Sequence, residues 1–493
     1  MPRDIILPLG DLPADAFRAH VHRVADWVAD YRESIAERRI TPVVRPGEIA
    51  GRFTAEAPAA GVPIETLLEQ LDDAIVPGLV HWGHPAFLGY FGSTSNGPAL
   101  LGEIVAAALN VSAMTWQTSP AATELETVVL RWIREMIGLP EEFTGVVYDT
   151  ASIATLHALA AAREVAGREI RARGLTGRRE LPVFRVYASD QAHSSVEKSM
   201  IMLGLGEENV VRVASDTAYK LDPRALRAAM DADASAGRRP MAVVATVGTT
   251  STASADPLRE IATTCRAHDA WLHVDAAYGG AIAVLPEGRA LMAGAELADS
   301  VVVNPHKWLF VPLDFSALFT RRPDVLRAVF ALTPEYLRGD ATAGAAIDYM
   351  DYGIQLGRRF RALKAWMVFR SFGRDGIAAR IREHCRLAAL LASWIDAEPH
   401  VALAAPQAMA IVCFRFAPPG LDDARADVLN ERIVEAVNAS GDAYLTHTRL
   451  RGRSCVRVGI GNILTEERHL AHVWTRVLAE ARRLDDARAS SAS

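Results

Sequence analysis

The sequence predicts an α/β protein with a mostly parallel main sheet that helices cover on both faces. From residue 119 onward, short and almost wholly apolar segments alternate with amphipathic helical segments. Strands that are apolar on both sides are typical of parallel sheets buried between helices. Ligands bind beyond the carboxyl ends of the strands in such sheets, so polar residues at those ends are the candidates for chemistry.

The elements follow one another in a regular order. A helix starts at Pro120, after the cap-like Ser119, and its apolar residues recur at helical spacing through Ile137. We expect strands at 184–189, 241–247, 271–275, 300–304 and 316–320, and helices at 151–166, 194–204, 223–231, 255–268 and 286–294. A long helix at 361–394 leads to strands at 409–416 and 455–460 and to helices at 423–439 and 466–483.

These elements divide the chain into three predicted regions. A length of 493 residues allows two or three domains. We expect a helical arm at 1–85, a large α/β domain at 86–377 and a small α+β domain at 378–493. The arm holds helices at about 13–39 and 63–75, which lie too far from any strand to form a core alone. We therefore expect the arm to pack on the main domain or on a partner subunit.

Composition excludes several classes of protein. The chain is 50% hydrophobic and 23% charged, as soluble globular proteins are. Its net charge of −6 gives no basic footprint for nucleic acid, and no apolar stretch is long enough to span a membrane. The 4 cysteines form no CxxC pair, and the first residues lack a signal peptide. We expect a cytoplasmic protein without disulfides or a metal.

Polar residues follow three of the predicted strands. A hydroxyl-rich loop follows 241–247, Asp275 ends the strand 271–275, and Lys307 follows the strand 300–304. An acid and an amine at one sheet edge suit pyridoxal phosphate, because its aldehyde condenses with a lysine and its pyridine nitrogen needs a carboxylate. Burial also favours the neutral form of such a lysine.

These residues are also compatible with simpler roles. Lys307 and Asp275 could form an ordinary ion pair. A phosphate-binding lysine is disfavoured because no GxxxxGK[ST] is present, and the lack of a GxGxxG after a strand disfavours nicotinamide or flavin. His81 and His84 have no third ligand at metal spacing.

Longer motifs decide between these roles. “HVDAAYGG” at 273–280 and “NPHKWLF” at 304–310 resemble the cofactor site of group II amino-acid decarboxylases, specifically the aromatic-L-amino-acid decarboxylase branch. Most of the chain shares the resemblance, in segments such as “HWGHPAFLGYFGSTSNGPALLGEI”, “TSPAATELETVVLRWIREMIGLP” and “LGRRFRALKAWMVFRSFG”. The resemblance implies a fold-type I large domain with a seven-stranded, mostly parallel sheet and an enzyme that uses pyridoxal 5'-phosphate.

The resemblance also implies roles for individual residues. Lys307 matches the lysine that binds the cofactor covalently, Asp275 the acid that pairs with the pyridine nitrogen, and His193 the histidine stacked on the ring. The other implied cofactor-binding residues are Ala277 beneath the ring, Thr246 beside it, and Asn304, His306, Ala151 and Ser152 at the phosphate end. A helix start such as the one at residue 151 favours an anion through its free N–H groups.

The phosphate turn departs from the family pattern at two positions. Asp149 stands where the family usually has glycine, and Ile153 stands where it has glutamate. An acid beside a phosphate site is electrostatically unfavourable unless its side chain caps the helix. We therefore expect Asp149 to alter the hydrogen bonding of the cofactor or its affinity.

A tyrosine on a mobile loop protonates the product in this family. Tyr349, in the loop-like segment 336–360, matches this position, with Tyr352 as the nearby competitor. Aldehyde-forming relatives replace this tyrosine or the stacking histidine, and this chain keeps both Tyr349 and His193. We therefore expect decarboxylation of an L-amino acid to an amine and CO2. An aldehyde synthase, an aminotransferase of the same fold and an inactive homologue are the alternatives.

The resemblance gives a less specific indication of the substrate. Residues at the family's aromatic side-chain pocket, partly across a homodimer interface, are Trp82, Phe91, Ser93, Trp116 and Thr118. Ordinary core packing is the alternative for each aromatic among them. Ser371 matches phenolic-substrate enzymes among plant relatives, but tyrosine, DOPA, phenylalanine and tryptophan all stay open. A homodimer is expected, with the arm packed on the second subunit.

Overall fold

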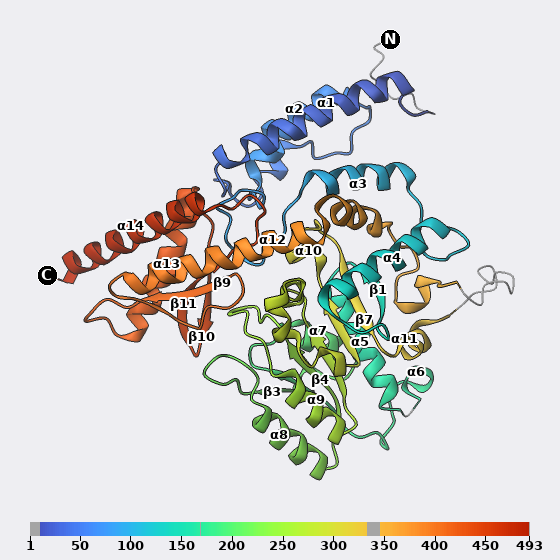
Figure 1. Cartoon of the computed structure of the whole chain (residues 1–493). Coiled ribbons are helices and arrows are strands. Elements are labelled where there is room, and N and C mark those ends of the chain that lie inside the picture. The colour runs from blue at the N-terminus through green and yellow to red at the C-terminus, as the bar shows by residue number, and fades with distance from the viewer. Residues whose placement is uncertain (1–9, 168, 333–345, 493) are drawn as a thin grey trace.

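A seven-stranded sheet forms the centre of the computed structural model, which describes residues 10–167, 169–332 and 346–492 (Figure 1). The strand order is β1-β7-β6-β5-β4-β2-β3. Strands β3, β2, β4, β5 and β6 run parallel to one another, and β7 is antiparallel to both β6 and β1. The strands are β1 (Thr144–Tyr148), β2 (Phe184–Ser189), β3 (Val210–Val213), β4 (Arg239–Thr246), β5 (Trp271–Asp275), β6 (Ser300–Val303) and β7 (Ser316–Thr320). The predicted mostly parallel sheet is confirmed.

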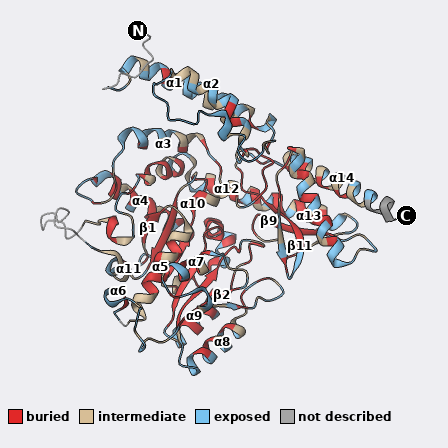
Figure 2. Cartoon of the chain, turned by 180° about the vertical axis from the view of Figure 1, so that it is seen from behind, coloured by how far each residue is buried: buried red, intermediate tan, exposed pale blue. Residues whose placement is uncertain are grey.

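Helices cover both faces of this sheet. One layer contains α5 (Ala151–Val165) and α7 (Ser195–Met202), which pack on each other. The other contains α8 (Pro223–Ser235) and α9 (Leu258–Ala267). Helices of both layers contact β4 and β5, and every residue of β5 is buried. Figure 2 shows the resulting core as buried strands inside helices whose outer sides are exposed.

The predicted helix after Ser119 is confirmed as α4 (Pro120–Ile137). Its apolar stripe is buried, including Val129 and Ile133, as the helical spacing predicts. The helix ends at Gly138, whose φ of 76° lies in the left-handed region that glycine adopts without steric cost. Ser119 precedes the helix, but its side chain makes no capping hydrogen bond.

Some predicted elements differ from the observed ones. Strands β1 and β3 were not predicted, and the helix expected at 286–294 is instead a 3-10 segment, Pro286–Met292. Proline and glycine disfavour an α-helix there. A Cβ atom on Gly288 would lie 2.2 Å from the carbonyl oxygen of Ile282, so this close approach requires glycine.

The small C-terminal sheet has the order β10-β11-β9-β8 and is antiparallel. It contains β8 (Val401–Leu403), β9 (Ile411–Phe416), β10 (Thr446–Leu450) and β11 (Arg453–Gly459), with helices α13 (Asp423–Ser440) and α14 (Glu467–Ala492). Of these strands, β8 and β10 were not predicted. Both sheets are joined by α12 (Arg361–Ala397), which contacts α3 (Gly97–Leu109) and α4 near its start and β8 and β9 near its end.

The N-terminal arm consists of α1 (Ala14–Glu33) and α2 (Ile64–Gln70), which lie side by side along one end of the molecule (Figure 1). Both are shorter than predicted, because 3-10 and π turns replace their last residues. The predicted boundary at 377/378 falls inside α12, four residues after its kink at Gly373. Within the described ranges, none of the helices has both the length and the apolar character needed to cross a bilayer.

Candidate active site

Three neighbouring strands end at one edge of the sheet and bring the predicted site residues together. The register of β4, β5 and β6 pairs Thr246 with Asp275 and Asp275 with a residue of β6. Lys307 follows β6 in a short helix, α10 (Pro305–Trp308), and His193 follows the end of β2. Because carboxyl ends of parallel strands share one edge, residues far apart in the sequence meet here.

Lys307 lies at the mouth of the apolar core. Its Nζ is 4.8 Å from the centroid of the Phe91 ring, which stacks on Tyr278 at 4.0 Å. Burial lowers the pKa of Lys307, Asp275 opposes that shift, and Arg457 adds to it. An amine whose neutral form is favoured is a nucleophile suited to condensing with a carbonyl.

Asp275 and His193 both interact electrostatically with Lys307. The Oδ1 atom of Asp275 accepts the N–H of Ala277 at 3.0 Å, which fixes the carboxylate. Burial lowers the pKa of His193, Asp275 raises it, and Lys307 lowers it further. The Nδ1 atom of His193 accepts the N–H of Ser195 at 3.1 Å, so the neutral ring carries its proton on Nε2.

Thr246 provides a direct test of whether a cofactor fits. Its hydroxyl is buried and has no hydrogen-bond partner among the residues that the structure describes. A buried unsatisfied hydroxyl costs free energy unless another group accepts or donates a hydrogen bond there. The backbone N–H of Thr246 is held by Asp256 at 2.7 Å, and burial raises the pKa of that carboxyl to about 6. The orphan hydroxyl therefore fits a polar group bound at the strand ends.

The start of α5 has the features of an anion site. Ala151 and Ser152 are its first residues, and their backbone N–H groups donate to no acceptor in the described part of the chain. Thr150, not Asp149, caps the helix by accepting the N–H of Ile153. The Oδ1 atom of Asp149 accepts the N–H of Thr150 at 2.7 Å. The capping role considered for Asp149 therefore belongs to Thr150.

Asn304 and His306 are fixed by contacts with the start of β7. The Oδ1 atom of Asn304 accepts the hydroxyl of Ser316 at 2.6 Å, and Nδ1 of His306 accepts the N–H of Phe315 at 2.9 Å. Burial lowers the pKa of His306 to about 3, with Lys307 adding to the shift. The neutral ring therefore carries its proton on Nε2, where it can donate to an anion. These groups together match the donors and the carboxylate that pyridoxal phosphate requires.

Tyr349 is the predicted proton donor, and that role stays a prediction. It begins a 3-10 helix, Tyr349–Tyr352, and its side chain is buried. Its hydroxyl lies 2.9 Å from the Thr127 hydroxyl, and the Arg358 guanidinium lies 4.8 Å from its ring centroid. The contacts described for Tyr349 therefore hold a segment of the fold. The rest of the expected loop falls partly on residues 333–345, outside the described residues.

Phe91 is the predicted substrate residue that the structure places beside Lys307. It also borders a cavity of about 520 Å³ together with Tyr90, Tyr444 and Arg457. Trp82 stacks on Tyr90 at 5.4 Å. The other three predicted substrate residues have different surroundings. Ser93 is half-buried, Trp116 donates its Nε1–H to Glu124 at 2.9 Å, and Thr118 bonds to Thr115.

Arg457 is a site residue that the sequence reasoning missed. It is buried in β11, and its guanidinium carbon lies 4.9 Å from the centroid of the Phe91 ring. Nε donates to the carbonyl oxygens of Thr250 and Ser251, and Nη1 to that of Tyr90, but Nη2 has no partner in the described part of the chain. An arginine inside the apolar run “CVRVGI” was the signal that could have identified it.

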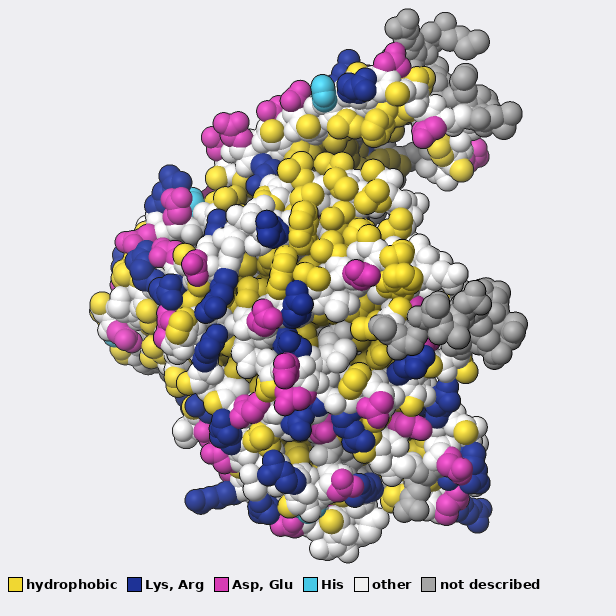
Figure 3. Space-filling model, turned by 45° about the vertical axis from the view of Figure 1, so that its right-hand side comes forward, with side chains coloured by type: hydrophobic (Ala, Val, Ile, Leu, Met, Phe, Trp, Pro, Cys, Tyr) yellow, Lys and Arg dark blue, Asp and Glu magenta, His cyan; other side chains and the backbone are white. Residues whose placement is uncertain are grey.

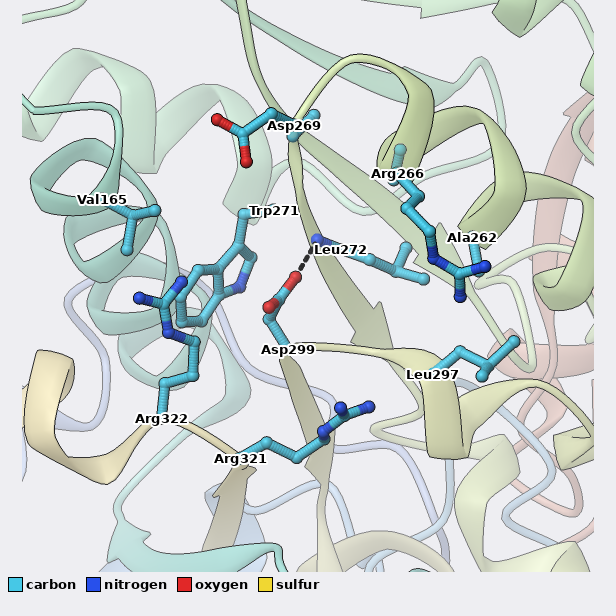
Figure 4. A pocket seen from close by; sticks show the side chains of 12 residues that line it. Val165, Ala262, Arg266, Asp269, Trp271, Leu272, Leu297, Asp299, Arg321 and Arg322 are labelled. Atoms are coloured by element: carbon cyan, nitrogen blue, oxygen red, sulfur yellow. Dashed lines mark hydrogen bonds between the residues drawn. The ribbon is translucent and has the colours of Figure 1, made fainter.

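A second cavity, of about 310 Å³, lies near the start of β5, at the strand end opposite to the predicted site (Figure 4). Trp271 and Leu272, at the start of β5, line it, and Asp299 accepts the N–H of Leu272 there at 2.8 Å. Arg321 and Arg322 border the same cavity. None of the predicted site residues lines it. No cluster of side chains suited to a metal occurs in residues 10–167, 169–332 or 346–492.

The chain belongs to the pyridoxal-dependent decarboxylase family. The family described as “Pyridoxal-dependent decarboxylase conserved domain” matches residues 46–417. The chain is therefore an enzyme of the carboxy-lyase class that uses pyridoxal phosphate to decarboxylate an amino acid. The predicted family, fold type and cofactor are confirmed.

Individual relatives cover almost the whole chain. Tryptophan decarboxylase 2 of Oryza sativa subsp. japonica is 38% identical over 482 residues, which are 96% of each protein. Phenylacetaldehyde synthase of Arabidopsis thaliana is 36% identical, over 96% of this chain and 97% of its own. The crystal structure of Oryza sativa TDC with PLP and tryptamine has a TM-score of 0.92 at 35% identity, over 97% of this chain and 99% of its own.

Proposed function

We propose that this decarboxylase acts on an aromatic L-amino acid and releases the corresponding amine and CO2. The observation that carries the proposal is the Phe91 ring beside Lys307, at the border of the cavity of about 520 Å³. Aromatic side chains stack favourably on such rings, and the volume lies within the range of small-ligand sites. The activities named for the relatives, on tryptophan and in forming phenylacetaldehyde, support an aromatic substrate.

The cofactor residues have distinct roles in this proposal. Pyridoxal phosphate, when bound, supplies the electron-withdrawing ring that accepts the electron pair of the breaking bond. When the cofactor is bound, Asp275 would keep the pyridine nitrogen protonated, Lys307 would provide the amine for the aldehyde, and His193 would lie against the ring. The groups assigned to the ring and phosphate are Ala277, Thr246, Asn304, His306, Ala151 and Ser152.

Arg457 is proposed to orient the carboxylate of the substrate. Its Nη2 atom is the unpaired donor of a buried cation, and a carboxylate would satisfy it. Its other nitrogens are occupied by backbone carbonyls, so it offers one free nitrogen rather than a two-nitrogen fork. A single contact can orient the carboxylate while stabilising it less than a bidentate grip, which suits a reaction that must release this group.

We propose a homodimer that completes the active site. Figure 3 shows hydrophobic side chains gathered over α3 and the facing side of the arm, and exposed residues there include Leu101, Ile104 and Phe17. Apolar patches of this kind are typical of protein interfaces. The exposed rings of Trp82 and Trp116 support a pocket completed across that interface, with Ser93 and Thr118 as further predicted members.

We also propose a cytoplasmic location and a division of the chain into three regions. A cytoplasmic location is supported by the cysteines, which are free thiols in the structure. A division into 1–85, 86–377 and 378–493 is supported by the separate positions of the arm, the main sheet and the small sheet.

The test is purified protein with pyridoxal phosphate and a panel of aromatic and acidic amino acids. CO2 and amine from an aromatic substrate are expected, and no CO2 from any aromatic substrate would refute the proposal. Because one relative is the phenylacetaldehyde synthase of Arabidopsis thaliana, aldehyde formation is the competing outcome. Aldehyde and peroxide are therefore measured in the same reaction. Aldehyde and peroxide in place of amine would identify an aldehyde synthase.

A further inference from the structure

A buried ion pair lies next to the turn that we assign to the phosphate. Glu126, on α4, and Arg358, before α12, are 2% and 6% exposed. Nη2 of Arg358 lies 2.6 Å from Oε1 of Glu126, and Nη1 lies 3.1 Å from Oε2. Replacing such a buried pair by apolar residues is often neutral or stabilising. Stability alone therefore does not account for the pair.

Two further hydrogen bonds of the pair go to Val147 of the edge strand β1, and Nη1 of Arg358 also donates to the carbonyl of Ala113 at 3.0 Å. Oε1 of Glu126 accepts the N–H of Val147 at 3.1 Å, and Nη2 of Arg358 donates to the carbonyl of Val147 at 2.8 Å. β1 is the edge strand, so its outer side has no neighbouring strand. The pair takes the place of that strand and fixes both backbone polar groups of Val147.

Val147 lies only four residues before Ala151, where α5 begins. The segment around Arg358 makes two more contacts with this stretch. The hydroxyl of Tyr148 donates to the carbonyl of Tyr352, and the side-chain amide of Gln355 lies 3.4 Å from Oδ2 of Asp149. The strand end leading into the phosphate turn is thus held at the backbone of Val147 and at the side chains of Tyr148 and Asp149.

These contacts explain how the chain accommodates Asp149 at a position where the family usually has glycine. Oδ1 of Asp149 accepts the N–H of Thr150, and Oδ2 faces the Gln355 amide. Both oxygens therefore have donors, and the carboxylate needs none of the N–H groups at the helix start. Asp149 is compatible with an anion at Ala151 and Ser152 because Gln355 and Thr150 partner its charge.

We propose that Glu126 and Arg358 are positioning residues that set the phosphate turn for the cofactor through Val147. The inference rests on the proposed assignment of Ala151 and Ser152 to the phosphate. Backbone N–H groups must point at the phosphate to bind it, so a shift of the strand end weakens phosphate binding specifically. Binding of pyridoxal, which lacks the phosphate, should change little.

The test compares the affinities of the full-length apoprotein for pyridoxal phosphate and for pyridoxal. Arg358→Gln should weaken pyridoxal phosphate binding at least about tenfold and pyridoxal binding less than about twofold. Glu126→Gln keeps an acceptor for Val147 and should show a smaller loss of the same kind. At saturating cofactor, the KM for the amino acid should stay within about twofold of the wild-type value.

Arg415→Gln is the matched control, because Arg415 is a buried arginine of the small domain that pairs with Asp427 at 2.5 Å. It should lower the melting temperature and leave both affinities unchanged. The inference is overturned if Arg358→Gln and Glu126→Gln destabilise the protein as the control does but keep the wild-type preference for the phosphate. If Arg358→Gln does not fold, Glu126→Gln decides alone. A wild-type protein without that preference would instead refute the assigned phosphate turn.

Discussion

Replacing His157 by leucine measures how strongly buried histidines limit the stability of this protein in acid. His157 lies in α5 between Tyr148 and Phe330, with ring centroids 4.6 Å and 4.5 Å away. Neither ring nitrogen has a hydrogen-bond partner among the described residues. Burial lowers the pKa of His157 to about 4, whereas the unfolded chain binds the proton near pH 6.5.

The sign and size of the effect follow from these two pKa values. The folded state binds fewer protons than the unfolded state below pH 6.5, so stability is lost as the pH falls through that value. From pH 7.5 to pH 5.5, the loss for one such histidine is about 1.3 kcal/mol. Burial lowers the pKa of His84, His273 and His384 to about 4 and that of His306 to about 3. The five together lose about 7 kcal/mol, which is comparable with the whole stability of many proteins.

Urea unfolding at pH 7.5 and pH 5.5 checks this prediction. His157→Leu should reduce the difference between the two pH values by about 1.3 kcal/mol. It should also stabilise the protein at pH 7.5 by about 1 kcal/mol, because leucine leaves no polar atom unsatisfied. His22→Leu, on the exposed side of α1, is the control and should keep the wild-type difference. If His157→Leu loses as much stability as the wild type between the two pH values, the buried neutral state of His157 is refuted.

Three further predictions concern the reaction. Lys307→Ala should lower decarboxylation about 10⁴-fold, and borohydride should no longer attach the cofactor covalently, as measured by mass spectrometry. Arg457→Gln should raise the KM about tenfold, and steady-state kinetics with an unchanged KM would contradict a role in holding the carboxylate. Tyr349→Phe should keep the amine as product and cost about 1 kcal/mol of stability, because its hydroxyl bonds to Thr127. Aldehyde and peroxide from this variant would instead support Tyr349 as the proton donor.

The strands that could be predicted are those whose own residues show the apolar pattern of a buried strand. β5 (WLHVD) and β7 (SALFT) are mostly apolar and fully buried, and they were placed correctly from the sequence alone. β1 contains Gly145, and β3 has only four residues, VVRV. β1 is a sheet strand because it pairs with β7, which is far away in the sequence, and β3 is one because it pairs with β2 on the other side of α7. Local pattern cannot reveal such strands, because long-range pairing decides them.

The same distinction holds for the site. Lys307, Asp275 and His193 lie at or just after the ends of strands that could be predicted from the sequence. The structure brings the three residues into one electrostatic cluster. For Arg457, the apolar run “CVRVGI” marks an unusual arginine, but its place in the site depends on the packing of β11 against the loop at Thr250. Tyr349 lies in a 3-10 helix with the Arg358 guanidinium over its ring, although the sequence around it has the composition of a loop, and its role as the proton donor stays a prediction.

The length of α12 limits which insertions and deletions this chain can tolerate. The helix begins three residues after Arg358, runs along α3 and α4, bends at Gly373 and ends against β8 and β9. Each residue of an α-helix adds about 1.5 Å and a rotation of about 100°. Deleting one residue before the bend would therefore turn the small sheet, and Arg457 with it, away from Lys307. Surface loops can tolerate insertions, but the first half of α12 works as a spacer of fixed length between the cofactor side and the substrate side of the site.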